Sequence, residues 1–73
     1  MFGIGMSWKI AKFEFEANNY FLSRYGFGVE IVGSFKLSEM SHNIYKDLER
    51  QNKLNSTDYI LELEKQFRSL GYI

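Results

Sequence analysis

The chain has 73 residues, no cysteine and no proline, and its nine basic and nine acidic residues cancel to a formal net charge of +0 at pH 7. The length predicts one small domain over residues 1–73, and the absence of cysteine excludes disulfides, thiolate metal sites and a cysteine nucleophile. The balanced charge excludes a strong general attraction to nucleic acid or to an anionic membrane. Because small secreted domains usually depend on disulfides, we expect a cytoplasmic protein.

Aromatic side chains are abundant and make up 18% of the residues, with seven Phe, five Tyr and one Trp. Each ring buries ~150–250 Å² when it is enclosed. A single domain of this length has little room for so much ring surface. We therefore expect part of that surface to be covered by another molecule.

The first eight residues are mostly apolar and include Gly3 and Gly5. Charged residues from Lys9 onward interrupt this run long before the ~20 apolar residues that a membrane-spanning helix needs. No signal-peptide pattern follows. We expect a frayed or strand-like beginning and no contact with a membrane.

Residues 8–25 carry two competing periodicities, and the first is that of a β-hairpin. Apolar and charged residues alternate up to Ala17, and Asn18 and Asn19 supply a tight turn into a second strand over Tyr20–Tyr25. The first strand would place Ala11, Phe13, Phe15 and Ala17 on one face and Lys12, Glu14 and Glu16 on the other. Paired asparagines are unfavourable in mid-helix and aromatic residues are enriched in strands, so both favour the hairpin.

The alternative for the same residues is a helix. An apolar residue recurs every three or four positions, and Gly26 would follow the last turn, where glycine is common. The apolar face of this helix would consist of Ile10, Phe13, Ala17, Tyr20 and Phe21. The sequence alone leaves both structures open.

A further strand is predicted from Gly28 to Leu37, after a turn bracketed by Gly26 and Gly28. Its residues alternate between two faces, as they do in a half-buried strand. The apolar face would carry Val29, Ile31, Phe35 and Leu37, and the polar face Glu30, Ser34 and Lys36. Gly33 is a candidate for a bulge or a close backbone approach.

A first helix is predicted over residues 39–52, with Ser38 as its N-cap. Its apolar stripe consists of Met40, Ile44 and Leu48, with Tyr45 at the edge of the stripe. Such spacing is typical of a helix that packs one face against a core. A short connection follows before the next helix.

A second helix is predicted over residues 57–70, with Ser56 or Thr57 as its N-cap and Asp58 in the first turn. Gly71 would end it, and Arg68 lies near that end, where a positive charge suits the helix dipole. Its apolar stripe consists of Ile60, Leu63, Phe67 and Leu70.

Together these elements predict an α+β fold. An antiparallel sheet would form from the N-terminal hairpin and the strand over residues 28–37, and the two C-terminal helices would pack on one face of it.

Candidate catalytic and metal-binding patterns are weak. His42 is the only histidine, and with Glu39 it forms one Glu-x-x-His pair, whereas a carboxylate-bridged metal site uses two such pairs and further glutamates. Ser38 and Ser41 lie near His42, but no other sign of a catalytic triad accompanies them. Two pairs of nearby glutamates, Glu14 with Glu16 and Glu62 with Glu64, are typical of solvated charged faces. We expect no enzyme activity, no metal and no cofactor.

The leading functional hypothesis is a small non-enzymatic protein-binding module. It would be a homodimer, or an inhibitor or regulator of a larger protein, of the kind that phages and mobile elements encode. Aromatic residues are common hot spots of protein interfaces, so we expect the partner to bind the aromatic N-terminal region. The predicted anchors are Trp8, Phe13, Phe15, Tyr20 and Phe21.

The alternative is a DNA-binding regulator. A strand followed by two helices resembles the order of elements in dimeric ribbon-helix-helix regulators, which lay paired strands in the DNA major groove. In this alternative, strand 28–37 holds the dimer, Lys36 lies on the ribbon, and Ser56 and Thr57 hold a phosphate at the start of the second helix. The neutral charge argues against it, since phosphate contacts normally dominate DNA affinity.

Overall fold

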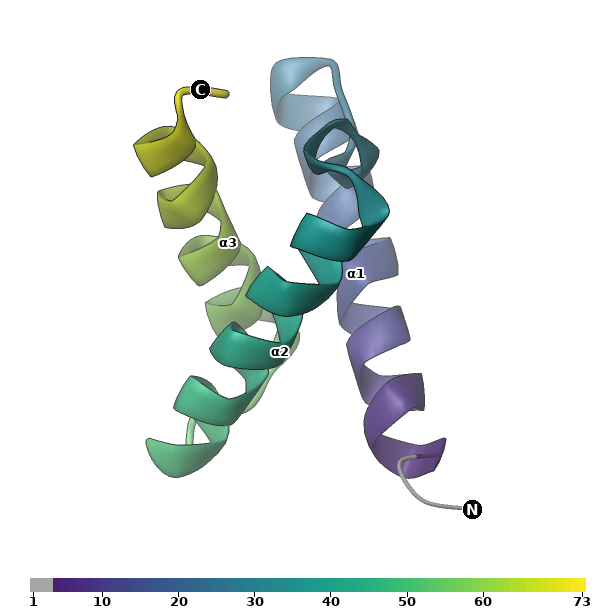
Figure 1. Ribbon diagram of the computed structural model, residues 1–73, viewed down its shortest axis with the longest axis vertical. Helices are drawn as coiled ribbons and strands as arrows, with labels where there is room; N and C mark the ends of the chain where they lie inside the picture. The colour runs from purple at the N-terminus through teal and green to yellow at the C-terminus, as the bar shows by residue number, and fades with distance from the viewer. Residues whose placement is uncertain (1–3) are drawn as a thin grey trace.

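The computed structural model describes the backbone of residues 4–73 and the side chains of residues 9–73. Its elements are α1 (Ile4–Tyr25), the 3-10 helix η1 (Val29–Val32), α2 (Ser34–Arg50) and α3 (Ser56–Leu70). Residues 4–73 contain no strand, so the predicted α+β fold with an antiparallel sheet is wrong. In Figure 1, α1 and α3 run in the same general direction, and α2 runs in the opposite direction.

The helical alternative for residues 8–25 is correct, and the hairpin is wrong. Phe13, Ala17 and Phe21 recur every four residues along α1, and all three are buried. The asparagine pair forms no turn, since both residues lie inside α1, and the Asn18 side chain makes a tertiary contact. Its Oδ1 accepts a hydrogen bond from the backbone N–H of Val29 at 3.0 Å.

Gly26 ends α1 as the helical alternative predicts. Its φ of 85° lies in the left-handed region that glycine adopts without strain. From there its N–H is directed at the carbonyls of Phe21 and Leu22, at 3.2 and 3.1 Å. These bonds satisfy backbone groups at the helix end that would otherwise lack partners.

The strand predicted over residues 28–37 is absent, since η1 and the first turn of α2 occupy this segment. Val29 and Val32 are buried at a spacing of three, which suits a 3-10 turn. Ile31 and Phe35, which a strand would place in the core, are exposed. The ribbon-helix-helix alternative depends on this strand and is therefore not supported by the fold.

The two predicted C-terminal helices are present. α2 begins at Ser34, before the predicted Ser38 cap, and the stripe of Met40, Ile44 and Leu48 is buried as predicted. Tyr45 is buried rather than at the edge.

α3 begins one residue earlier than predicted, because Asn55 caps it instead of Ser56 or Thr57. The Asn55 side chain accepts a hydrogen bond from the N–H of Asp58 at 2.9 Å. At the other end, Gly71 has a φ of 90° and ends the helix as predicted. Leu70 is exposed, so the buried stripe ends at Phe67.

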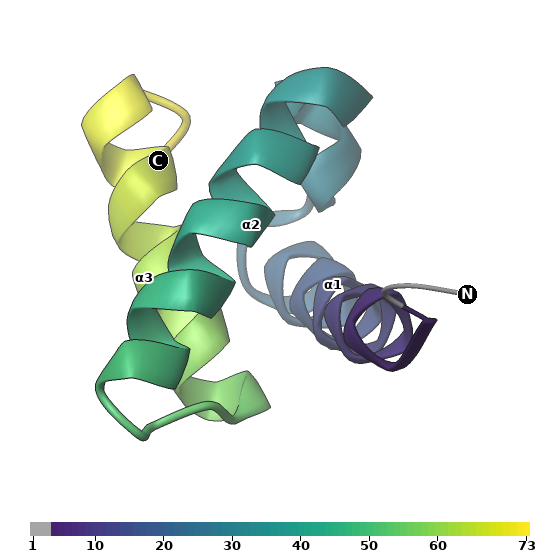
Figure 2. The ribbon, with the colours of Figure 1, turned by 60° about the horizontal axis from the view of Figure 1, so that its bottom comes forward.

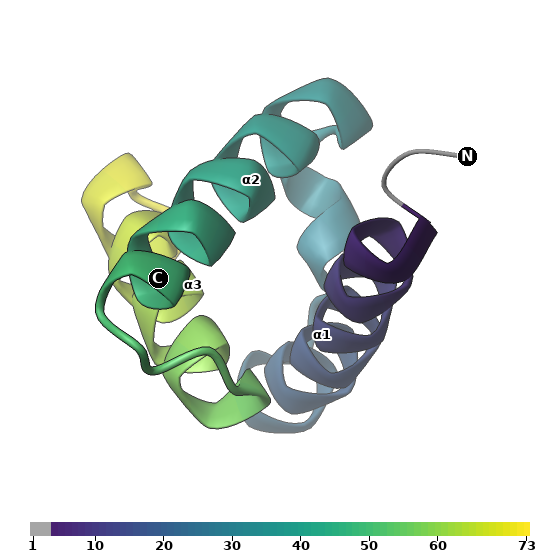
Figure 3. The ribbon, with the colours of Figure 1, turned by 90° about the horizontal axis from the view of Figure 1, so that it is seen from below.

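The three long helices surround an aromatic core, and Figures 2 and 3 show them grouped around a common centre. The buried rings are Phe13, Phe21, Tyr45, Tyr59 and Phe67. Phe21 of α1 stacks on Phe67 of α3 with 4.7 Å between ring centroids, and Phe13 contacts Tyr59 at 5.4 Å. None of the helices within residues 4–73 has the length and apolarity that a membrane crossing requires.

Candidate functional site

The four predicted anchors whose side chains the structure describes do not share one surface. Phe13 and Phe21 belong to the core, with 8% and 0% of their surface exposed, so a partner cannot reach them in this fold. Tyr20 is partly buried, and its hydroxyl is bonded to Glu64. Of these four, only Phe15 is openly exposed, at 67%. The side chain of Trp8 lies outside the described residues.

The residues of the DNA-binding alternative lie on helices. Lys36 is exposed in the first turn of α2, and Thr57 is exposed at the start of α3. Ser56 precedes Thr57 on the same turn, but the cap of α3 is Asn55. The structure therefore removes the ribbon on which Lys36 was expected to read DNA.

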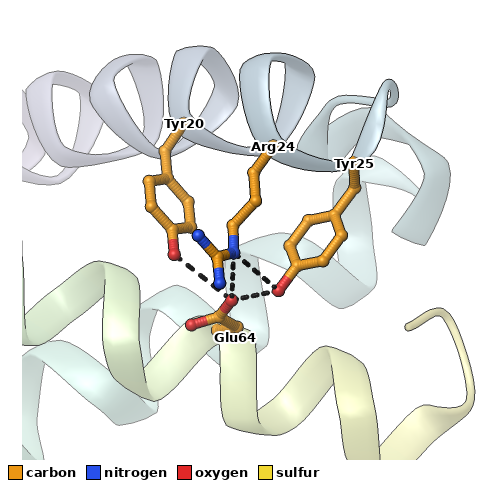
Figure 4. A network of polar contacts seen from close by, with 4 residues as sticks. All are labelled: Tyr20, Arg24, Tyr25 and Glu64. Atoms are coloured by element: carbon orange, nitrogen blue, oxygen red, sulfur yellow. Dashed lines mark hydrogen bonds and ion pairs between the residues drawn. The ribbon is translucent and has the colours of Figure 1, made fainter.

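Glu64 of α3 makes the main polar contacts between α3 and α1 (Figure 4). Its carboxylate accepts hydrogen bonds from the Tyr25 hydroxyl and from the Tyr20 hydroxyl, the latter at 3.3 Å. Nε of Arg24 lies 3.6 Å from the same oxygen. Glu64 is buried although its neighbour Glu62 is not, so the predicted solvated pair is wrong for Glu64.

The contacts of Glu64 fit a structural role. Its interacting oxygen already faces two hydroxyls and a guanidinium, which compensate for burying a charge. Partial burial, followed by the negative charge of Glu64, raises the pKa of Tyr20 and keeps its hydroxyl protonated as a donor. The network therefore links α1 to α3, and its polar groups interact with one another.

A second polar network joins all three helices inside the core. Ser41 of α2 donates to Glu14 of α1 at 2.7 Å and shares a hydrogen bond with the Tyr59 hydroxyl of α3 at 2.5 Å. A serine has one hydroxyl proton, so Tyr59 donates to Ser41 and Ser41 donates to Glu14. Burial raises the pKa of Tyr59 to about 12, which keeps this donor protonated.

This network lies beside a shallow groove, but the arrangement does not form a catalytic site. The groove has a volume of about 310 Å³ and is lined by Ile10, Ala11, Glu14, Ser38 and His42. Among the described side chains, Ser38 and His42 share no hydrogen bond, and Ser41 is only 1% exposed. A serine nucleophile needs both a base within hydrogen-bond reach and access to substrate. Within the described part of the chain, no three acidic or histidine side chains are grouped to hold a metal.

The fold leaves several large apolar side chains exposed. Leu61, Leu70 and Tyr72 belong to α3 and the C-terminus, and the others form a set on α1, η1 and the start of α2. We call it the α1–α2 apolar face. It consists of Phe15, Leu22, Ile31 and Phe35. Phe35 is 82% exposed and Phe15 is 67% exposed, which are high values for rings of this size.

Sequence reasoning identified Phe15 but missed the other three residues of this face. Phe15 and Leu22 are seven residues apart, which places them on one side of a helix two turns apart. That signal is visible only if residues 8–25 are taken as a helix. Ile31 and Phe35 were assigned to the core because strand alternation groups them with Val29.

Comparison with known proteins found no match, since no protein-family model, curated protein or solved structure matches this chain. No activity or partner can therefore be transferred from a relative. The functional conclusion depends on the geometry and exposure of this chain's own side chains.

Proposed function

We propose that this chain is a small, non-enzymatic protein-binding module that contacts its partner through the α1–α2 apolar face. The observation that carries the proposal is the exposure of Phe35 and Phe15 to water, at 82% and 67%. Covering a large apolar side chain on binding is worth ~1.5–3 kcal/mol. Exposed apolar patches rimmed by polar residues mark contact sites on soluble domains.

Folding alone does not account for Phe35. The ring lies in the first turn of α2, is mostly in water, and makes little contact with the core. An acidic residue would suit this position better, because it would face the positive end of the helix dipole, and the first turn of α2 has none. We therefore expect Phe35 to contribute to binding another molecule rather than to the stability of the fold.

Contact with another protein also fits the charge of the chain. The formal net charge is zero, so no general attraction to nucleic acid competes with apolar contacts. A domain of this size would act as a regulator or inhibitor by covering part of its partner. The absence of cysteine supports a cytoplasmic setting for that contact.

A capture experiment with two matched variants tests the proposal. Phe35→Asp removes the most exposed ring, and Leu61→Asp introduces the same charge on α3 at a side chain that is 49% exposed. We expect the tagged wild-type protein to retain a specific protein from native lysate supplemented with untagged chain. Phe35→Asp should reduce the retained amount at least tenfold, because a central ring is commonly worth more than ~1.4 kcal/mol.

Leu61→Asp is the control and should retain the partner at the wild-type level. Helix content measured by circular dichroism should be the same for all three proteins. Equal retention by wild type and Phe35→Asp would contradict the proposal, as would equal loss in both variants.

A further inference from the structure

We propose that the molecule covering the α1–α2 apolar face is a second copy of this chain. This inference rests on the proposed function, because it names the occupant of the same face. Three observations support it: the position of the face beside a groove, its area, and the absence of net charge. The dimer would be two-fold symmetric, with the same patch contributed by both copies.

Two residues of the face, Phe15 and Phe35, each lie about one helical turn from a residue that lines the groove between α1 and α2. On α1, Ala11 lines the groove, and Phe15 follows it by four residues, or one helical turn. On α2, Ser38 lines the groove, and Phe35 precedes it by three residues. The exposed rings therefore lie next to a recess that is itself partly apolar.

This layout is self-complementary. Each copy presents the protruding Phe35 ring and also a groove whose apolar walls include Ile10 and Ala11. In a two-fold dimer, the ring of one copy can enter the groove of the other, and the reverse contact forms at the same time. The groove volume of about 310 Å³ leaves room for one ring in each copy.

The exposed apolar area of the four side chains approaches the apolar share of a standard interface. At 67% and 82% exposure, Phe15 and Phe35 together expose ~300 Å² if a whole ring side chain counts as ~200 Å². Leu22 and Ile31, each less than half exposed, add ~100 Å². A typical interface covers ~800 Å² per partner, of which somewhat more than half, or ~450 Å², is apolar.

The charge of the chain permits this association. Two copies with a formal net charge of zero do not repel each other over long distances. A net charge near zero promotes association of like molecules. The second copy is also the one partner that is always present at the concentration of the chain itself.

Sedimentation equilibrium of the purified full chain tests the inference. We compare wild type with Phe35→Asp and with the matched pair Leu22→Asp and Leu61→Asp, whose leucines are 46% and 49% exposed. The charge change is the same in every variant. Phe35→Asp places an acidic residue in the first turn of α2, where it is favourable, so loss of the dimer would not reflect loss of the fold.

We expect a wild-type dimer with a micromolar dissociation constant, at or below ~10 µM. Phe35→Asp and Leu22→Asp should raise that constant at least about thirtyfold, while Leu61→Asp should change it less than about threefold. A wild-type chain that stays monomeric up to ~1 mM overturns the inference. So does a dimer that Phe35→Asp leaves intact.

The failure of this inference is distinguishable from failure of the proposed function. If the chain is monomeric but Phe35→Asp abolishes capture of a different protein, the occupant is that protein and only the dimer is wrong. If Phe35→Asp changes neither self-association nor capture, both proposals are wrong.

Discussion

The Tyr59 hydroxyl shows how a single buried residue makes this fold sensitive to pH. Burial raises its pKa from 10.0 to about 12, so the folded chain keeps the proton to higher pH than the unfolded chain does. A group with a raised pKa in the folded state stabilises the fold fully below its unfolded pKa, and this contribution is lost above the folded pKa. We therefore expect the free energy of unfolding to fall by roughly 2–3 kcal/mol between pH 10 and pH 12.

Chemical denaturation at closely spaced pH values measures this loss. Tyr59→Phe is the control, because it keeps the ring in the core and removes the ionisable hydroxyl. The variant should be about 1 kcal/mol less stable at neutral pH, since Ser41 loses a donor. Its unfolding free energy should decline less steeply above pH 10. A decline as steep as that of the wild type would contradict the role given to Tyr59.

The residues of the polar networks could not be predicted from the sequence, for a physical reason. Glu14 and Glu64 each have a second glutamate two positions away, a pattern typical of solvated faces. What distinguishes them is the presence of hydroxyl donors on other helices, Ser41 for Glu14 and Tyr25 for Glu64. Such partners are 27 and 39 residues away in the chain and become visible only when the helices are packed.

At the scale of elements, we expect the Glu64 network to stabilise the packing of α1 against α3. Glu64→Gln removes the charge that Arg24 and the two tyrosine hydroxyls face. We expect the variant to lose about 1–2 kcal/mol of unfolding free energy, because hydrogen bonds to a charged group are stronger than neutral ones. Urea denaturation followed by circular dichroism measures the change.

Glu62→Gln is the matched control, two residues before Glu64 on the same helix and on a different side of it. Glu62 is only half-buried and pairs with the exposed Lys65 at 3.4 Å, so its loss should cost less than ~0.5 kcal/mol. If both substitutions have the same effect, the network does not join α1 to α3 in the way described.

Local signals were sufficient for α3 and for the body of α2, but they were misleading for the start of α2 and for the first half of the chain. The Met40, Ile44 and Leu48 stripe, the first-turn Asp58 and the final Gly71 all point to helices, and each signal is local. In residues 8–37 the apolar residues fit a period of two as well as a helical period. The helical structure is stabilised by contacts between residues that are far apart in the chain. Examples are the hydrogen bond from the N–H of Val29 to Asn18 and the stacking of Phe21 on Phe67. No short window of sequence contains these contacts.

At the scale of the whole molecule, the aromatic content divides into an enclosed part and an open part. Among the side chains of residues 9–73, five rings are buried between the three long helices, whereas Phe15 and Phe35 remain largely exposed in the single copy. The exposure of Phe15, one of the predicted anchors, follows from the helix, since the predicted strand would have placed Phe15 on the same face as the buried Phe13. Phe35 was missed because its exposure depends on where α2 begins.

Photo-crosslinking tests most directly whether another protein covers the α1–α2 apolar face. A photoreactive phenylalanine analogue would replace Phe35 in one protein and the exposed Leu61 of α3 in another. We predict that irradiation in the cells that make this protein yields a discrete protein adduct at position 35, in at least tenfold excess over position 61. Equal yields at the two positions, or no protein adduct at position 35, would contradict the proposal that this face is a protein-contact surface.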